Sequence, residues 1–303
     1  MENAYSTLNG YAPETHGKRG KIVTGTNQAE NASTTVPVPS RFTVPGAELA
    51  TEFSDEGGHP VVQLHGLTSS RARDRLLNLD LGRGLHGTRL LRYDARGHGN
   101  STGRPVAEDY RWPNLAEDLL LLLDEWFPGE RIHGVGPSMG CATMLHAALL
   151  DPGRFSGFTL MAPPTAWGSR VAKAAEYEVT ADLVAKHGAQ ALLDVERDHI
   201  DPPAIAGGPV TSPDVPGELL PWVFRGAAMS DLPAQRALTG IDAPSTILAW
   251  AEDPAHPLST AQALAKLLPR AALHVAETRA DVDRWPGILL DDVTTNGRLT
   301  NPR

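Results

Sequence analysis

Short apolar runs of strand-like composition alternate with stretches of helical periodicity along most of this chain. The strand-like runs lie at residues 41–44, 48–53, 60–64, 88–93, 131–135, 157–162, 245–250 and 272–276. Helical spacing of apolar residues is found at 115–126, 139–150, 259–268 and 281–290. Parallel strands need long crossover connections, usually helices, so this alternation predicts an α/β fold with a mostly parallel sheet and helices on both faces.

Two segments interrupt the alternation of strands and helices and define the expected domain organisation. Residues 1–40 are rich in Asn, Thr, Ser, Gly and Pro and show no strand or helix period, which predicts a flexible N-terminal arm. Residues 163–232 separate two strands by roughly 70 positions, too many for an ordinary crossover, and predict a mostly helical lid insertion. The core then comprises residues 41–162 and 233–292, followed by a C-terminal tail at 293–303.

Composition excludes several classes of function. The chain carries 27 Lys and Arg against 36 Asp and Glu, a formal charge of −9, so it lacks the basic surface that nucleic-acid binding requires. Its one cysteine, Cys141, rules out an intrachain disulfide and a thiolate zinc cluster, and packing is its expected role. No apolar stretch approaches the ~18 residues that span a bilayer. We therefore expect a cytoplasmic protein without a membrane segment.

The strongest local motif is the sequence Gly-Pro-Ser-Met-Gly at residues 136–140, with Ser138 at its centre. It follows the strand expected at 131–135 and precedes the helix expected at 139–150. A serine on a tight turn between strand and helix needs small neighbours, because its backbone is strained. The turn lifts the side-chain oxygen clear of the sheet beside a helix N-terminus, so this context favours a nucleophilic serine over an idle one.

Two further motifs follow neighbouring strands. His65-Gly66 and the next two residues come directly after the run at 60–64, where loop N–H groups can point at a substrate oxygen. Residues 94–101 read D-x-R-G-x-G-x-S after the run at 88–93. In this order, and with the lid insertion, the three motifs resemble the α/β-hydrolase superfamily over residues 41–292. The resemblance implies the α/β-hydrolase fold.

The resemblance also implies roles for individual residues. Ser138 would be the nucleophile, and the backbone N–H groups of Leu67 and Met139 would form the oxyanion hole. The family's acid lies after the strand at 245–250, where Asp253 is the best match and Glu252 is the alternative. The histidines of the two loop motifs, His65 and His98, would shape their loops.

The family's general base, a histidine after the last strand, has no counterpart in this sequence. The last histidine, His274, lies inside the strand expected at 272–276. Serine alone is a weak nucleophile, so a base must come from elsewhere. We predict His256, three residues after Asp253, with Asp253 or Asp281 bound to its second nitrogen. The alternative is that His256 is a surface or supporting residue.

No metal-ligand cluster, phosphate-binding loop or dinucleotide fingerprint is found in the sequence, so no cofactor and no metal are expected. The sequence predicts a serine-dependent hydrolase of a small, largely apolar ester, lactone or thioester, with Trp167 or Trp222 of the lid facing the substrate. The alternative is a lyase, cyclase, isomerase or inactive binding protein that uses the same pocket. A small-molecule substrate is the only partner indicated, and the oligomeric state is not encoded in any motif.

Overall fold

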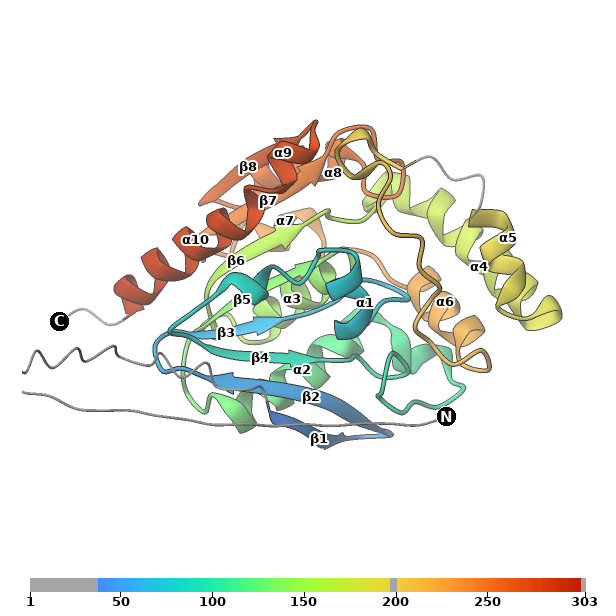
Figure 1. Ribbon diagram of the computed structural model, residues 1–303, viewed down its shortest axis with the longest axis horizontal. Helices are drawn as coiled ribbons and strands as arrows, with labels where there is room; N and C mark the ends of the chain where they lie inside the picture. Colours follow the sequence, from blue (N-terminus) through green and yellow to red (C-terminus); the bar gives the residue numbers. More distant parts are fainter. Residues whose placement is uncertain (1–37, 197–200, 301–303) are drawn as a thin grey trace, which may run out of the picture. The chain divides into compact units, whose positions relative to one another are not determined.

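The computed structural model describes residues 38–196 and 201–300, so nearly all of the expected N-terminal arm lies outside the described residues. Within these ranges the chain forms an eight-stranded sheet in the order β1-β2-β4-β3-β5-β6-β7-β8 (Figure 1). The strands are β1 (Val38–Val44), β2 (Ala47–Asp55), β3 (Pro60–Gln63), β4 (Arg89–Tyr93), β5 (Ile132–Pro137), β6 (Phe155–Met161), β7 (Ser245–Trp250) and β8 (Ala271–Ala276). Each lies within three residues of a run that the sequence predicted.

The sheet is antiparallel at one edge and parallel elsewhere. The hairpin of β1 and β2 turns at Gly46, whose φ of 81° suits glycine, and β2 pairs antiparallel with β4. The strands from β4 through β3, β5, β6, β7 and β8 are all parallel to their neighbours. Their carboxyl ends therefore share one edge, where ligands bind in open α/β sheets.

Helices cover both faces of this sheet. On one face α2 (Trp112–Trp126), α3 (Met139–Leu150) and α8 (Leu258–Leu267) enclose the larger apolar core. On the other face α10 (Trp285–Thr300) buries Trp285, Leu289 and Val293 against the strands, together with Leu81 and Leu85. The predicted α/β architecture is confirmed. Among the residues described, no helix is both long and apolar enough to cross a membrane.

Residues 163–232 lie between β6 and β7 and carry α4 (Arg170–His187), α5 (Gln190–Glu196) and α6 (Leu220–Ala228). These helices share a small apolar cluster that includes Val184, Leu220 and Phe224. Helix α4 packs on α6 along one side, and Val179 of α4 is 70% exposed. The position of residues 163–232 over the site, as a lid, stays a prediction.

The C-terminal region differs from expectation. The sequence predicted one helix at 281–290 and a tail at 293–303, but the structure has α9 (Arg279–Val282) and then α10, which continues to Thr300. Pro286 explains the break, because proline suits the first turn of a helix and not its interior. Val293 and Asn296 are buried against the sheet, so α10 packs on the core beyond residue 292, where the sequence predicted a tail.

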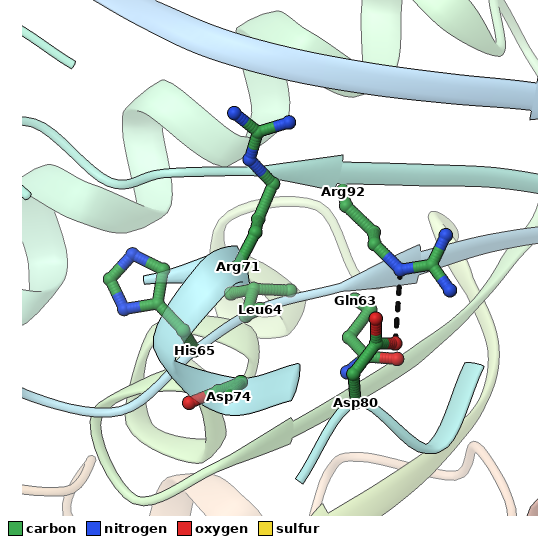
Figure 2. Close-up of a pocket in the computed structure, with 7 residues that line it drawn as sticks. All are labelled: Gln63, Leu64, His65, Arg71, Asp74, Asp80 and Arg92. Atoms are coloured by element: carbon green, nitrogen blue, oxygen red, sulfur yellow. Dashed lines mark hydrogen bonds and ion pairs between the residues drawn. The ribbon is translucent and has the colours of Figure 1, made fainter. Parts of the chain in front are cut away.

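A cluster of mostly polar and charged side chains, which we call the polar layer, lies near the carboxyl end of β3 and around α1 (Arg71–Leu76) (Figure 2). Seven residues line a cavity of about 10 Å³ within it: Gln63, Leu64, His65, Arg71, Asp74, Asp80 and Arg92. Asp74 is 2% exposed. Its Oδ1 accepts a 2.5 Å hydrogen bond from the Ser69 hydroxyl, whereas its Oδ2 has no hydrogen-bond partner among the described residues.

Burial raises the pKa of Asp74 to about 7, despite the hydrogen bond from Ser69, and the charge of Asp80 adds to the rise. Above pH 3.8 the unfolded carboxyl is ionised while the folded one keeps its proton, so the folded state loses stability as the pH rises to about 7.

Replacing Asp74 with Asn removes this titration while Oδ1 can still accept from Ser69. The free energy of unfolding of Asp74→Asn, relative to wild type, should therefore rise by about 2–4 kcal/mol between about pH 4 and 8. Urea denaturation at a series of pH values measures it. Asp242→Asn, at an exposed carboxylate, is the control and should follow wild type. Parallel pH profiles for Asp74→Asn and wild type would contradict the prediction.

Candidate active site

Ser138 occupies a sharp turn between β5 and α3. Its φ of 50° and ψ of −109° lie outside the regions that L-residues prefer, so its backbone is strained. The Ser138 N–H donates to the Met161 carbonyl at 2.9 Å, which fixes the turn to β6. Its side chain is partly exposed, between buried neighbours.

The two glycines of the motif are required by close packing. A Cβ on Gly136 would lie 2.8 Å from the carbonyl oxygen of Leu64, and one on Gly140 would lie 3.0 Å from the Cβ of Leu64. Both distances are shorter than ordinary contacts. Small residues are therefore needed for the turn at Ser138 to reach the end of β3.

The loop at residues 65–68 lies beside the serine, since a Cβ on Gly66 would be 3.8 Å from the Cβ of Ser138. Its predicted oxyanion donor, Leu67, is half-buried, and the second predicted donor, Met139, begins α3. Among the described residues, no hydrogen bond uses the backbone N–H of Leu67 or Met139. The first N–H groups of a helix have no partner within the helix, which leaves the Met139 donor unpaired at the start of α3.

His65 holds this loop in place. Its Nε2 accepts the Ala95 N–H at 2.9 Å, so its Nδ1 carries the proton and donates to the Gly66 carbonyl at 2.8 Å. Burial lowers the pKa of His65, which keeps the ring neutral. His98 lies beside it with ring centroids 5.1 Å apart, and burial lowers the pKa of His98 to about 3. Both histidines are placed to shape loops.

Asp253 and His256 meet in the loop after β7. Nδ1 of His256 lies 2.8 Å from Oδ2 of Asp253. Oδ1 of Asp253 accepts the backbone N–H groups of Ala255 at 2.8 Å and of His256 at 3.1 Å. Burial acts to raise the pKa of Asp253, but these hydrogen bonds and the charge of His256 outweigh it and hold the pKa below its ordinary value. Asp253 is thus an ionised, buried partner for the imidazole.

The other two candidate acids lie elsewhere. Glu252 is exposed and has a φ of 60°. Asp281 accepts hydrogen bonds from the N–H groups of Glu277 and Thr278 and from the Thr278 hydroxyl, and forms an ion pair with Arg284. These bonds cap α9. The described contacts of Asp281 therefore do not include His256.

His256 has one nitrogen bound and one free among the described residues. Its side chain is 21% exposed, and its ring meets the edge of Trp250 at a centroid distance of 5.9 Å. Trp250 in turn stacks on Trp285 at 5.7 Å. No hydrogen bond between Ser138 and His256 is formed in the described structure. Catalytic hydrogen bonds between a base and its nucleophile are often long when no substrate is bound, so His256 stays a candidate general base.

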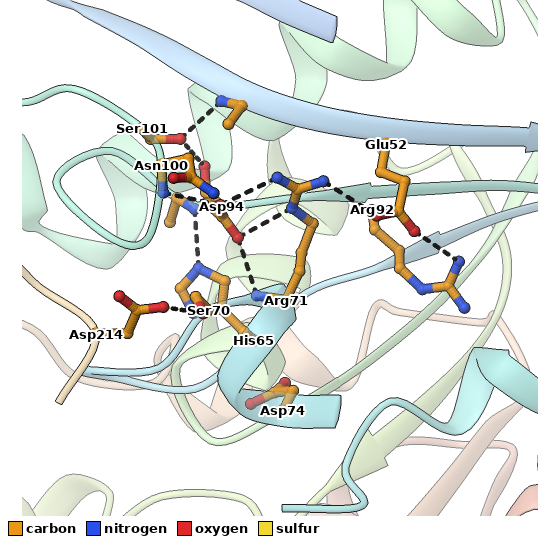
Figure 3. Close-up of polar contacts among 12 residues, drawn as sticks. Glu52, His65, Ser70, Arg71, Asp74, Arg92, Asp94, Asn100, Ser101 and Asp214 are labelled. Atoms are coloured by element: carbon orange, nitrogen blue, oxygen red, sulfur yellow. Dashed lines mark hydrogen bonds and ion pairs between the residues drawn. The ribbon is translucent and has the colours of Figure 1, made fainter. Parts of the chain in front are cut away.

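An ion pair between Asp94 and Arg71 lies beside the loop at residues 65–68 (Figure 3). Asp94 accepts three hydrogen bonds from Arg71, at 2.9 to 3.1 Å, and one from the Asn100 N–H. These bonds join α1 to the loop at 94–101. Asp94 stood in a recognised motif, whereas Arg71 carried no sequence signal.

A metal site was not expected, and within residues 38–196 and 201–300 no group of three or more His, Cys, Asp or Glu side chains is arranged to hold an ion. Cys141 is buried beneath the turn at Ser138. Its Sγ lies 3.1 Å from the Gly136 carbonyl oxygen and 3.0 Å from that of Met161. Burial raises the pKa of its thiol. This environment favours packing over reactivity.

Comparison with known proteins bears on the fold. Residues 59–188 match the family model of the alpha/beta hydrolase fold. No curated protein matches the chain. A hydrolase from Pseudomonas aeruginosa PA01 is 24% identical with a TM-score of 0.68, over 85% of this chain and 97% of its own.

Two further solved structures are similar. A thermophilic esterase from Thermogutta terrifontis is 20% identical with a TM-score of 0.68, over 87% of this chain and 100% of its own. An enol-lactonase from Burkholderia xenovorans LB400 is 21% identical with a TM-score of 0.65, over 84% and 100%. Identities this low establish the fold. With the sheet order, they show that this chain has the α/β-hydrolase fold.

Proposed function

We propose that the chain is a serine hydrolase of a small, largely apolar ester, lactone or thioester. Ser138 is the nucleophile, His256 the general base and Asp253 the carboxylate that orients His256. The N–H groups of Leu67 and Met139 bind the oxyanion. The observation that carries the proposal is the 2.8 Å contact between His256 Nδ1 and buried Asp253, in the loop after β7.

The proposed mechanism is acyl transfer through the serine. Oγ of Ser138 attacks the carbonyl carbon while Nε2 of His256 takes its proton, and Asp253 stabilises the imidazolium. The free N–H groups of Leu67 and Met139 stabilise the negative oxygen of the tetrahedral intermediate. The imidazolium then protonates the leaving group, and water attacks the acyl enzyme with His256 as base. Acid and base share one loop here, unlike the family pattern.

The other described histidines fit the role of base less well. His65 uses both ring nitrogens in loop contacts, and burial lowers the pKa of His133 to about 3 while its Nε2 is held at 2.9 Å by Thr159. His274 lies inside β8, the strand at one edge of the sheet, and not in a loop at the carboxyl ends of the strands. His256 combines a carboxylate at hydrogen-bond distance with a free second nitrogen, which is the arrangement a general base needs.

The first test uses Ser138→Ala and His256→Ala with p-nitrophenyl butyrate as substrate. Each should lower kcat by about 100-fold or more with little change in the unfolding midpoint, because each removes a group that acts in the transition state. His274→Ala is the matched control and should keep wild-type activity. A fluorophosphonate probe should label wild type at Ser138, as intact mass and peptide mapping would show.

Wild-type activity in His256→Ala beside an inactive Ser138→Ala would exclude His256 as the base. Absence of labelling, with full activity in both variants toward the natural reaction, would instead favour the non-hydrolytic alternative.

The substrate class is inferred from the site's surroundings. Leu67 packs against both the main core and the apolar cluster of the insertion, so the oxyanion loop presents an apolar side chain next to Ser138. The formal charge of −9 also disfavours anionic substrates. Trp167 packs on the main core and Trp222 on the insertion's cluster, which supports an apolar surrounding. Two structural neighbours are an esterase and an enol-lactonase.

A panel of esters that differ only in acyl charge tests this class. Butyrate and hexanoate esters should be hydrolysed with a kcat/KM at least about tenfold above that of a hemisuccinate ester of the same alcohol, because burying an unpaired carboxylate is costly. Equal or faster turnover of the hemisuccinate ester would contradict the apolar assignment.

A further inference from the structure

One extended segment of the insertion, residues 211–215, lies against the oxyanion loop; we call it the strap. It runs between the short turn Pro203–Ile205 and α6. The backbone N–H of Asp214 donates to the Thr68 carbonyl at 2.9 Å, and the Asp214 carbonyl accepts the Gly99 N–H at 2.8 Å. The Asp214 carboxylate accepts a 2.5 Å hydrogen bond from the Ser70 hydroxyl (Figure 3). Asp214 thus touches two loops of the predicted site.

The loop it touches is a strained turn. The Ser69 N–H donates to the Gly66 carbonyl at 3.2 Å, which closes a four-residue turn with Leu67 and Thr68 at its centre. Thr68 has a φ of 57°, a region that favours glycine or asparagine and disfavours a β-branched residue. Such a conformation persists only where its surroundings hold it.

The turn is held at both ends. His65 fixes the Gly66 carbonyl, which shares a peptide plane with the Leu67 N–H. At the other end the Thr68 carbonyl accepts from Asp214 and, at 3.2 Å, from Arg73. Arg73 also donates to the Thr211 hydroxyl at 2.9 Å, so the strap is bound to α1 as well.

The Asp214 side chain adds a third anchor. Ser70 is the N-cap of α1: its hydroxyl accepts the Arg73 N–H at 3.0 Å while it donates to Asp214. The next residue of the strap, Val215, is buried in the apolar cluster of the insertion. Movement of the insertion would therefore be transmitted to the turn that carries the Leu67 N–H.

We propose that Asp214 is a positioning residue for the oxyanion hole, which couples the insertion to the Leu67 N–H through Ser70 and Thr68. The proposal rests on the proposed function of Ser138 and Leu67. Asp214 touches no reacting atom in it. It acts by limiting the orientations of the turn at residues 66–69.

The test compares Asp214→Ala with Asp214→Asn, whose Oδ1 can still accept from Ser70. Asp182→Ala is the matched control, because Asp182 is also a carboxylate of the insertion but pairs with Arg225, away from the turn. In Asp214→Ala, kcat for p-nitrophenyl butyrate should fall about tenfold with KM within about twofold of wild type, since misplacing a transition-state donor lowers kcat. Asp214→Asn and Asp182→Ala should stay near wild type.

A second readout does not depend on catalysis. Amide hydrogen exchange at Ser69, whose N–H closes the turn on the Gly66 carbonyl, should be faster in Asp214→Ala than in wild type, and unchanged in Asp182→Ala. A Ser70→Ala and Asp214→Ala double-mutant cycle should show that the two losses in kcat are not additive.

Unchanged exchange at the Ser69 amide in Asp214→Ala would overturn the proposal, whatever the activity of Ser138→Ala. So would an equal loss of kcat in Asp182→Ala or in Asp214→Asn. If Ser138→Ala stayed active while exchange rose in Asp214→Ala, the proposed function would fall, and the role of Asp214 in holding the turn would stand.

Discussion

The close approach of β3 and β5 is the constraint on which the site depends. The Leu64 N–H donates to the Val135 carbonyl at 2.9 Å, and the space beside Leu64 admits no side chain at Gly136 or Gly140. Because the two strands end together, the turn at Ser138 and the loop after β3 lie side by side. A larger residue at either glycine would separate them. The serine's strained backbone is stable here because buried neighbours on every side hold it.

Around these turns, hydrogen bonds from charged side chains fix the orientation of the loops more closely than apolar packing would. Asp94 binds Arg71 and the loop at 94–101, while His65 fixes the Gly66 carbonyl and Asp214 fixes Thr68. A hydrogen bond requires particular angles between its two groups, whereas apolar packing requires mainly that the two surfaces touch. Asp74 is the exception within this layer, because its Oδ2 has no described partner and its pKa is raised to about 7. Stability is reduced at neutral pH by that carboxyl, while the polar layer as a whole fixes the loops.

The proposed arrangement of acid and base departs from the usual order of the fold. A histidine after β8 would approach the serine from a separate loop, whereas His256 shares its loop with Asp253 and is bound to it at 2.8 Å. One short segment after β7 would then supply both groups, and the loop after β8 is left to cap α9 through Asp281. In the proposed mechanism the position of this single segment sets the activity of Ser138. That mechanism requires Nε2 of His256 to lie within hydrogen-bond reach of the Ser138 hydroxyl.

The sequence by itself determined the strands, the helix Met139–Leu150 and the three loop motifs, because periodicity and turn chemistry depend on residues close together in the chain. It also placed Asp253 three residues before His256, a spacing short enough to predict their pairing. Only the tertiary structure decided that α10 continues to Thr300 and that Asp214 binds Ser70 across 144 positions. Those outcomes depend on which distant segments meet after folding. No local pattern records such contacts, because their energy exists only once the sheet and the insertion have brought the partners together.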